Sequence, residues 1–424
     1  MKPLRRRSLI TGCVALTALA LAGCSGSAGG FQESGGSGSA TSADLRLLVN
    51  ITPVLTKEFY RNLVAPFEKA HPGVKVSIEA PTASDVSATL QQQLAAGSPP
   101  DLVSGSLSAE IVPQLSPLPE EQWVKDTPYA EQSRVGGTMW QAGSGNQVQS
   151  IVFYNKSAFA KAGITDMPKT MNELTEDLVR LKDAGYVPAQ TAGEWVTGAQ
   201  VQMMANPNVL DTAPDWFNRR NKGEVDFARS DWSKVLEVYQ SWIERKLTPP
   251  DAMGLKYQDA IDQFLAGKSA TFIMGSWFVP TADEAKKSFD VGVFAMPTLD
   301  GSPAPVSGGP SIPWSILKSS KNQSAALDLL KYLVTDKTAV VAELKAEGNF
   351  RKGFDYPASP LNQAVGEIVS ASAATVVASS GQGDNSAPTG FNDELNKQVQ
   401  GLYLGKTPKD VLASIDSWYT SNAR

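Results

Sequence analysis

The 424-residue sequence predicts an α/β fold of two lobes. Strand-like and helix-like patterns alternate from about residue 44 to the C-terminus, and this order calls for a sheet with parallel neighbours and helices on its faces. At about 380 residues this part exceeds one ordinary hydrophobic core, so two lobes are expected. It contains no cysteine, and its stability must therefore come from burial of apolar surface.

Residues 1–23 are predicted to be a secretory signal. Four cations (Lys2, Arg5, Arg6 and Arg7) precede an apolar run of 14 residues, Leu9–Ala22, which is shorter than the roughly 20 residues of a membrane-spanning helix. The run ends in Leu-Ala-Gly-Cys, which resembles the lipobox of bacterial lipoproteins. The resemblance implies cleavage before Cys24 and a diacylglycerol on its sulfur. Arg6-Arg7 also resembles a twin-arginine export motif, so both the Sec and the twin-arginine routes stay open.

Residues 24–43 are predicted to be a flexible tether. A chain so rich in glycine and serine buries too little apolar surface to offset the conformational entropy lost on ordering. Its reach is about 23 Å. Loss of residues 1–23 removes four positive charges and lowers the formal charge from −5 to −9, which argues against nucleic acid or anionic lipid as partners. We therefore expect the protein on the extracellular face of the cell membrane, held there by its lipid.

The first elements of the folded part follow in regular order. A strand over 45–49 is followed by a helix that begins at Thr56 and stops at His71-Pro72-Gly73. A second strand over 74–78, a helix over 86–96 and a third strand over 101–103 complete a βαβαβ unit. In such sheets, ligands collect outside the carboxyl ends of the strands.

Three later helices carry start signals. Thr170 and Glu173 form a capping box before leucines at helical spacing. Ser324 is predicted to open a helix, and Thr407-Pro408 combines a cap with a first-turn proline.

Several segments, taken in order, are typical of one family. They are Phe67-Glu68-Lys69 with His71–Val76, Leu94–Leu102, Val152–Lys156 with Phe159 and Ala162–Ile164, Pro168–Leu174, Phe264–Ala270, Met274–Trp277, Gly292-Val293 with Met296-Pro297, and Gly308-Gly309. The chain resembles the extracellular solute-binding proteins of ABC importers (family 1), in particular the carbohydrate-binding members related to maltose-binding protein. The resemblance spans nearly the whole mature chain.

The resemblance implies a periplasmic-binding-protein-like fold, in which two α/β lobes joined by hinge strands close over a ligand in the cleft. By analogy, the chain crosses between the lobes near Val148, Thr298 and Gly348. The first lobe is then 44–147 plus 298–348, and the second is 148–297 plus 349–424.

The candidate site follows from the resemblance and from sugar chemistry. Sugar rings stack their C–H faces on aromatic rings, and their hydroxyls need fixed hydrogen-bond partners. Trp277 matches a family position where an aromatic residue stacks on the sugar, and Glu194 is expected to accept hydroxyl protons while Trp195 stacks. The full set of predicted ligand-binding residues is Trp277, Ser276, Trp195, Glu194, Asn50, Phe391, Trp140 and Gly309.

Other residues leave alternatives open. Trp216 and Trp314 are further candidates for the site, whereas Trp232, Trp242 and Trp418 are expected to pack in the core. Arg351 stands where relatives often have a proline-containing turn. It would either bind an acidic substituent of the ligand or act as a solvated hinge arginine.

Enzyme classes find little support in the sequence. His71 is the single histidine, so no two-histidine metal site can form and a Ser-His-Asp triad is unattractive. Ser315 and Lys318 have the serine-to-lysine spacing of penicillin-recognising enzymes, but the other motifs of those enzymes do not accompany them. A glycosidase needs two facing carboxylates, and no motif identifies such a pair.

We therefore predict a non-enzymatic, monomeric, lipid-anchored binding component of an ABC transporter, without cofactor or metal, that captures a carbohydrate and delivers it to permease subunits. The alternatives are a binding protein for a polyol or glycerol phosphodiester, and a secreted lipoprotein glycoside hydrolase.

Overall fold

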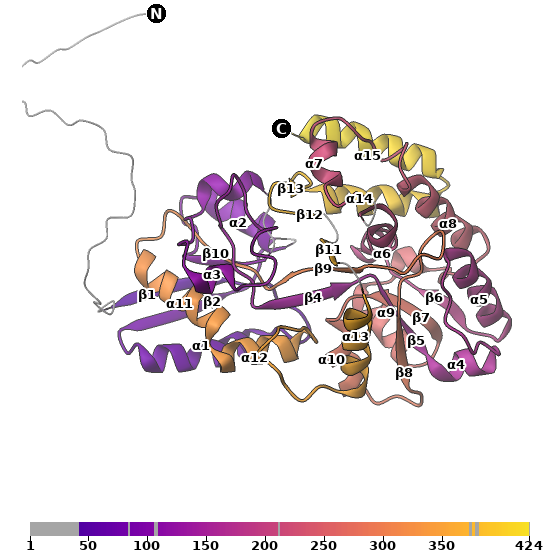
Figure 1. Ribbon diagram of the computed structural model, residues 1–424, viewed down its shortest axis with the longest axis horizontal. Helices are drawn as coiled ribbons and strands as arrows, with labels where there is room; N and C mark the ends of the chain where they lie inside the picture. Colours follow the sequence, from indigo (N-terminus) through magenta and orange to yellow (C-terminus); the bar gives the residue numbers. More distant parts are fainter. Residues whose placement is uncertain are drawn as a thin grey trace, which may run out of the picture. The chain divides into compact units, whose positions relative to one another are not determined.

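A computed structural model describes residues 42–83, 85–105, 109–210, 213–372, 375–377 and 381–423 (Figure 1). The predicted signal segment, Cys24 and nearly all of the predicted tether lie outside the described residues. Within the described part, no helix is long and apolar enough to cross a membrane.

The first lobe is built on a four-stranded sheet of order β10-β3-β1-β2. Its strands are β1 (Ala43–Leu48), β2 (Val74–Glu79), β3 (Leu102–Ser104) and β10 (Trp314–Ile316). Its helices are α1 (Lys57–Ala70), α2 (Val86–Ala95), α3 (Gln122–Lys125), α11 (Gln323–Thr335) and α12 (Lys337–Ala346). β1 runs parallel to β2 and β3, which confirms the predicted βαβαβ unit, while β10 joins the edge in the antiparallel direction.

Helix α1 shows how local sequence sets these elements. The hydroxyl of Thr56 accepts a hydrogen bond from the backbone N–H of Phe59 at 3.1 Å, which confirms the predicted helix start. Tyr60, Leu63 and Phe67 form the buried stripe that packs on the sheet. Full burial of such a side chain stabilises the fold by about 1.5–3 kcal/mol.

The second lobe is built on a four-stranded sheet of order β6-β7-β5-β8. Its strands are β5 (Ile151–Asn155), β6 (Val187–Gln190), β7 (Ser269–Met274) and β8 (Val291–Ala295). The helices of this lobe are α4 (Lys156–Lys161), α5 (Met171–Asp183), α6 (Val196–Ala205), α7 (Trp216–Asn221), α8 (Trp232–Glu244), α9 (Tyr257–Leu265), α10 (Phe278–Glu284), α13 (Pro360–Ala371), α14 (Phe391–Gln400) and α15 (Pro408–Asn422), of which α14 packs on α6 and α15 packs on α8 and α14. Short helical turns cover Ala109–Gln114, Asn206–Leu210, Ala252–Gly254 and Gly401–Leu404, and the hairpin β12 (Gly381–Gln382) with β13 (Asn385–Ser386) precedes α14.

Most of the predicted helix starts and packing roles hold. The capping boxes at Thr170 and Thr407 are both present. Helix α11 begins at Gln323, one residue before the predicted Ser324. Trp232 and Trp242 are buried in the core of the second lobe, as expected.

A third sheet, of order β11-β9-β4, contains the strands that cross between the lobes. β4 (Gly145–Gln149) runs antiparallel to β9 (Val306–Ser311), which pairs with β11 (Thr375–Val377), and Figure 1 shows β4 and β9 side by side. The return strand lies later than the expected crossing near Thr298, because Thr298 still bridges Thr170 of the second lobe.

A buried hydrogen-bond network ties the three crossings together. Asn349 accepts a hydrogen bond from the Ser276 hydroxyl at 2.6 Å and donates one to the Ser311 hydroxyl at 2.6 Å. The Ser276 hydroxyl also accepts a hydrogen bond from the backbone N–H of Val148 in β4 at 3.1 Å. All three polar side chains of this hinge network (Ser276, Ser311 and Asn349) are fully buried.

Asn349→Ala is expected to lower the free energy of unfolding by about 2–4 kcal/mol, because it leaves two buried hydroxyl groups without their partner. Urea denaturation of the variant measures the loss. Asn172→Ala, at an exposed position on α5, is the matched control and should change stability by less than about 0.5 kcal/mol. An equally small change for Asn349→Ala would show that the hinge network is not a stabilising element.

Candidate ligand-binding site

A cavity of about 230 Å³ lies between first-lobe residues and aromatic residues of the second lobe. We call it the aromatic cavity. Its lining residues are Asn50, Thr52, Pro53, Val54, Gln147, Trp195, Tyr257, Trp277, Thr281 and Glu347. Three predicted site residues, Asn50, Trp195 and Trp277, therefore meet at one place. Asn50 follows β1 and Trp277 follows β7, so this is the carboxyl-end position expected of a ligand site in such sheets.

Three aromatic rings line the second-lobe side of this cavity. The rings of Trp195 and Tyr257 lie 4.7 Å apart between centroids, at 54°, and Trp195 remains 41% exposed. Burial raises the pKa of Tyr257, and hydrogen bonding with Trp277 opposes that effect. Rings of this kind offer apolar faces on which a ligand ring can stack.

Trp277 owes its position to the glycine two residues before it. A Cβ atom at Gly275 would clash with the indole of Trp277, so only glycine lets the ring lie against the backbone there. The intervening Ser276 points the other way, into the hinge network. Ser276 was predicted to bind the ligand, but its hydroxyl is buried and already used between β4 and Asn349.

Glu194 has a positioning role that the sequence did not reveal. Its backbone lies in the left-handed region, at φ 52°, and its carboxylate accepts a hydrogen bond from the backbone N–H of Tyr257 at 3.0 Å. Its carbonyl accepts hydrogen bonds from the side chains of Asn396 and Gln400. Glu194 thus fixes the start of α9 and the Trp195–Tyr257 pair, whereas we predicted that it would accept hydroxyl protons from the ligand.

Two polar residues that line the aromatic cavity, Gln147 and Glu347, lie at or next to segments that cross between the lobes. Gln147 lies in β4, in register with Gly309 of β9, and a side chain at Gly309 would meet open space. Gly309 is therefore a neighbour of the cavity and not part of its lining. Glu347 forms the C-cap of α12 and is 6% exposed. Burial raises its pKa to about 8.

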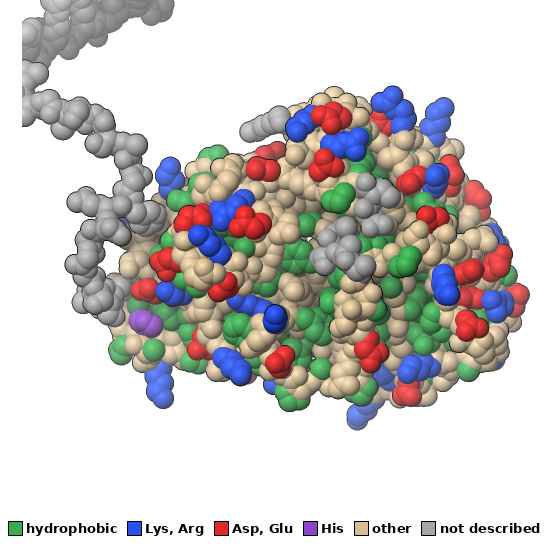
Figure 2. Space-filling model, in the orientation of Figure 1, with side chains coloured by type: hydrophobic (Ala, Val, Ile, Leu, Met, Phe, Trp, Pro, Cys, Tyr) green, Lys and Arg blue, Asp and Glu red, His purple; other side chains and the backbone are tan. Residues whose placement is uncertain are grey.

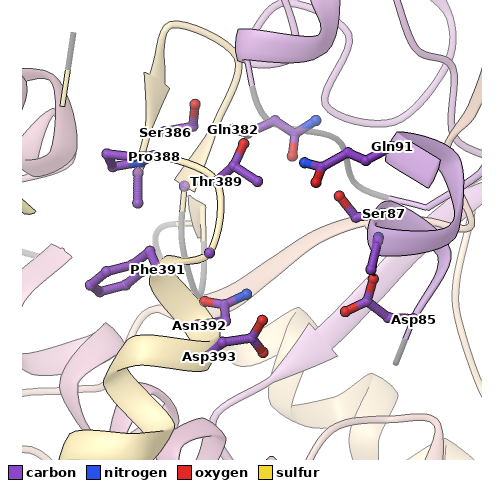
Figure 3. Close-up of a pocket in the computed structure, with 14 residues that line it drawn as sticks. Asp85, Ser87, Gln91, Gln382, Ser386, Pro388, Thr389, Phe391, Asn392 and Asp393 are labelled. Atoms are coloured by element: carbon purple, nitrogen blue, oxygen red, sulfur yellow. The ribbon is translucent and has the colours of Figure 1, made fainter. Parts of the chain in front are cut away.

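A second cavity, of about 300 Å³, is lined mainly by polar groups from both lobes, and we call it the polar cavity. Figure 3 shows Asp85, Ser87 and Gln91 at the start of α2 facing Asn392 and Asp393 at the start of α14. Burial raises the pKa of Asp393, and the nearby charge of Asp85 adds to this effect. Hydroxyl, amide and carboxylate groups of this kind suit a ligand with many hydroxyl groups.

Phe391 contributes to the wall of the polar cavity, but its ring points away from α2 (Figure 3). The ring is only 1% exposed and stacks on Phe227, with 5.5 Å between centroids. Its main role is therefore core packing, because a ring held among other aromatic side chains is not free to stack on a ligand.

Other predicted residues lie away from both cavities. The Trp140 indole donates to the carbonyl of Val135 at 3.1 Å and packs against a small core cluster of the first lobe. Trp216 and Trp314 are buried core residues.

Arg351 takes neither of the two roles left open for it. Its guanidinium donates to the carbonyl groups of Ser144, Val334 and Asp126 at 3.1, 2.7 and 3.2 Å. Burial lowers its pKa. It is a partly buried hinge residue that binds backbone oxygens.

Sequence reasoning missed seven lining residues of the aromatic cavity: Thr52, Pro53, Val54, Gln147, Tyr257, Thr281 and Glu347. A signal existed for Gln147 and Glu347, because each precedes a crossing that the resemblance had located near Val148 or Gly348. Tyr257 and Thr281 are brought to the cavity only by tertiary packing. Among the described residues, no group of three His, Cys, Asp or Glu side chains forms a metal site.

Comparison with known proteins gives a consistent result. The profile of the family described as "Bacterial extracellular solute-binding protein" matches residues 52–340. A multiple sugar-binding protein of Streptococcus mutans is 21% identical over 301 residues, which cover 65% of this chain and 67% of that protein. A diacetylchitobiose-binding protein of Streptomyces coelicolor is 26% identical over 199 residues, and the match spans less than half of each chain (45% and 44%). The solved structure of a chitin oligosaccharide binding protein superimposes with a TM-score of 0.77 at 22% identity, covering 91% of this chain and all of that one.

Gly275→Ala is expected to displace the Trp277 indole, because the added methyl group occupies its place. Tryptophan fluorescence should report a changed ring environment, and any ligand that stacks on Trp277 should bind about tenfold more weakly or worse. Gly254→Ala is the matched control, since a Cβ there meets nothing within 4 Å. An unchanged fluorescence spectrum would contradict the proposed steric role of Gly275.

Stability is expected to fall as pH rises, owing to two buried carboxyl groups of α12. Burial raises the pKa of Glu343 to about 8, against the opposing influence of Ser144 and Trp314, and that of Glu347 to about 8. Between the ordinary glutamate pKa of 4.5 and about 8, the native state binds more protons than the unfolded state. The free energy of unfolding therefore decreases with pH in this window, by up to about 1.4 kcal/mol per pH unit for each group.

Urea denaturation at pH 5.5, 7 and 8.5 measures this slope. Glu343→Gln should roughly halve it, because Glu347 still contributes, whereas Glu367→Gln, at an exposed position on α13, should leave it in place. A wild-type stability that rises over the same range would show that these carboxyl groups do not titrate as their burial requires.

Proposed function

The chain belongs to the bacterial extracellular solute-binding protein family, and from this premise we propose that it is the lipid-anchored substrate-binding component of an ABC importer for a carbohydrate. The ligand is an oligosaccharide or a glycoside, held between the lobes and delivered to permease subunits. The observation that carries this proposal is the aromatic cavity, in which rings of the second lobe face Asn50 of the first.

The two cavities together match the chemistry of a sugar. The rings of Trp195, Tyr257 and Trp277 supply stacking surfaces, and the polar cavity supplies hydrogen-bond donors and acceptors for hydroxyl groups. The names of the Streptococcus mutans and Streptomyces coelicolor relatives point to sugar ligands too. No lysine or arginine lines either cavity in the described part of the chain, which disfavours a glycerol phosphodiester as the ligand.

Capture by lobe closure is supported by the crossing sheet. β4, β9 and the segment around Asn349 join the lobes at three points, so relative motion is confined to one hinge. We propose that the first lobe comprises 44–147 plus the segment from the β9 crossing to 348, and that the second comprises 148 to the β9 crossing plus 349–424. A ligand stabilises the closed form only by the additional contacts that it makes there.

The proposed anchor is a lipid on Cys24, which places a monomeric protein on the extracellular face of the membrane. Support comes from the sequence around Cys24 and from the family. On the face shown in Figure 2, acidic and basic side chains are interspersed, a pattern that suits weak, charge-guided encounters with a permease. The protein binds its ligand without chemically changing it.

A thermal-shift screen of the full chain against mono- and oligosaccharides, polyols and glycerol phosphodiesters tests this function. A ligand at one hundred times its dissociation constant should stabilise the native state by about 2.7 kcal/mol. Trp195→Ala and Trp277→Ala should weaken binding of the sugar by about tenfold or more, because each removes a stacking surface.

Trp123→Ala is the matched control, since Trp123 lies in the first lobe beside Lys331, with 5.6 Å from the ammonium to the ring centroid. It should leave affinity unchanged. An unchanged melting temperature with every carbohydrate would contradict a sugar ligand and favour a non-sugar solute. Recovery of a cleaved product would identify a hydrolase instead.

A further inference from the structure

Glu347 is the one charged side chain among the residues that line the aromatic cavity. It is 6% exposed, and none of the described ion pairs or side-chain hydrogen bonds uses its carboxyl group. Carboxyl groups that are buried to this extent are normally paired, because an uncompensated charge in a poorly solvated place is costly. Since no described side chain pairs with it, the Glu347 carboxyl group is either held protonated or paired by a ligand.

None of the titratable groups that the described residues place against Glu347 is basic. They are Tyr60 of α1, Tyr257 of α9 and Glu343 of its own helix, and burial raises the pKa of each, so all three are mostly uncharged at pH 7. Glu347 is also the C-cap of α12, a helix of ten residues, whose C-terminal end carries partial negative charge. The helix end favours a positive charge at this point in the cavity, and these neighbouring groups supply none.

The aromatic rings add a third preference for a cation. Trp195, Tyr257 and Trp277 line the same cavity as Glu347. The face of such a ring attracts a cation that lies within about 6 Å of its centroid, and the attraction grows when the site is shielded from water. A carboxyl group together with aromatic faces is a chemical environment that an ammonium group satisfies better than a neutral hydroxyl does.

We propose that the aromatic cavity selects a sugar that carries a protonated amino group, with the ammonium beside Glu347 and the sugar ring against the aromatic residues. This inference rests on the proposed function as a carbohydrate-binding protein and narrows its ligand class to amino sugars. A neutral sugar would donate a hydroxyl hydrogen bond to Glu347 but would leave no charge to compensate the carboxylate.

Ligand binding then moves a proton. In the empty cavity burial raises the pKa of Glu347 to about 8, so at pH 7 the carboxyl group is mostly protonated. An ammonium beside it favours the carboxylate, and Glu347 releases its proton to solvent when the ligand binds. A neutral sugar gives no such release.

Isothermal titration calorimetry of the full chain at pH 7 tests the proposal with matched pairs, in which an amine replaces one hydroxyl. The monosaccharide pairs are glucosamine and glucose, galactosamine and galactose, and mannosamine and mannose. A disaccharide pair, glucosaminyl-β-1,4-glucosamine and cellobiose, differs by one amine in each of its two rings. In at least one pair the amine should bind about tenfold more tightly or better. Titration in two buffers of different ionisation enthalpy should detect a proton released with the amine and none with the neutral sugar.

Two variants test whether Glu347 causes the preference for the amino sugar over the neutral sugar. Glu347→Gln keeps the size and hydrogen-bonding capacity of the side chain but removes its charge, so the ratio of the two affinities should fall to near one. Glu343→Gln, one helical turn away and outside the cavity lining, is the matched control and should retain the preference and the proton release. If Glu347→Gln fails to fold, the affinities of the matched pairs and the two-buffer titration of the wild type still test whether the cavity prefers an ammonium group.

The failures of the two proposals are distinguishable. Equal or tighter binding of the neutral member in every pair overturns the amino-sugar inference and leaves carbohydrate capture in place. Absence of an amine preference because no member of any pair binds also overturns the inference, and the wider screen of oligosaccharides then judges the proposed function separately. A preference that survives in Glu347→Gln overturns the role given to this residue.

Discussion

The buried amide of Asn349 is the contact through which the three crossings between the lobes are held in one place. It bonds to the hydroxyl groups of Ser276 and Ser311, and Ser276 in turn bonds to the backbone of β4. Each of these groups is removed from water, so each requires its partner. A hinge made of three separate segments then behaves as one unit, because none of them can shift without leaving a buried polar group unsatisfied.

The same short segments also build the ligand site. Within Gly275-Ser276-Trp277, the serine enters the hinge network while the tryptophan lines the aromatic cavity. Within Glu347-Gly348-Asn349, the glutamate lines the cavity and the asparagine enters the network. Gly348 makes this possible, because its φ is +59° and a Cβ there would lie 2.6 Å from the Ser276 carbonyl oxygen. The proposed site and the hinge network are therefore joined through neighbouring residues, and a ligand bound in the aromatic cavity would lie beside residues of the network.

The elements of the first lobe could be predicted from local sequence patterns. Contacts between residues far apart in the sequence could not, because they depend on tertiary packing. The parallel βαβαβ unit and the capping boxes depend on residues close in sequence, so their signals are readable there. Trp277, Trp195 and Asn50 were predicted to meet at one site, and they line one cavity because they lie at ends of elements. The bond between Glu194 and the N–H of Tyr257 could not be predicted, because it joins residues 63 positions apart. The stacking of Phe391 on Phe227 could not be predicted either, since Phe227 lies far away in the sequence.

The carboxyl groups of α12 show a conflict between stability and binding. Glu343 and Glu347 lie one turn apart on the same helix face, and both are buried in the first lobe near the hinge. Burial of two like-charged groups disfavours their ionised forms, so the empty protein at neutral pH holds protons that the unfolded chain would release. A core built for stability alone would place apolar side chains there. Glu347 differs from Glu343 in that it reaches the cavity, where a ligand can supply the missing positive charge. The cost of burying this group is then greatest in the empty state and is offset in the bound state, and that difference in free energy favours lobe closure around a cationic ligand.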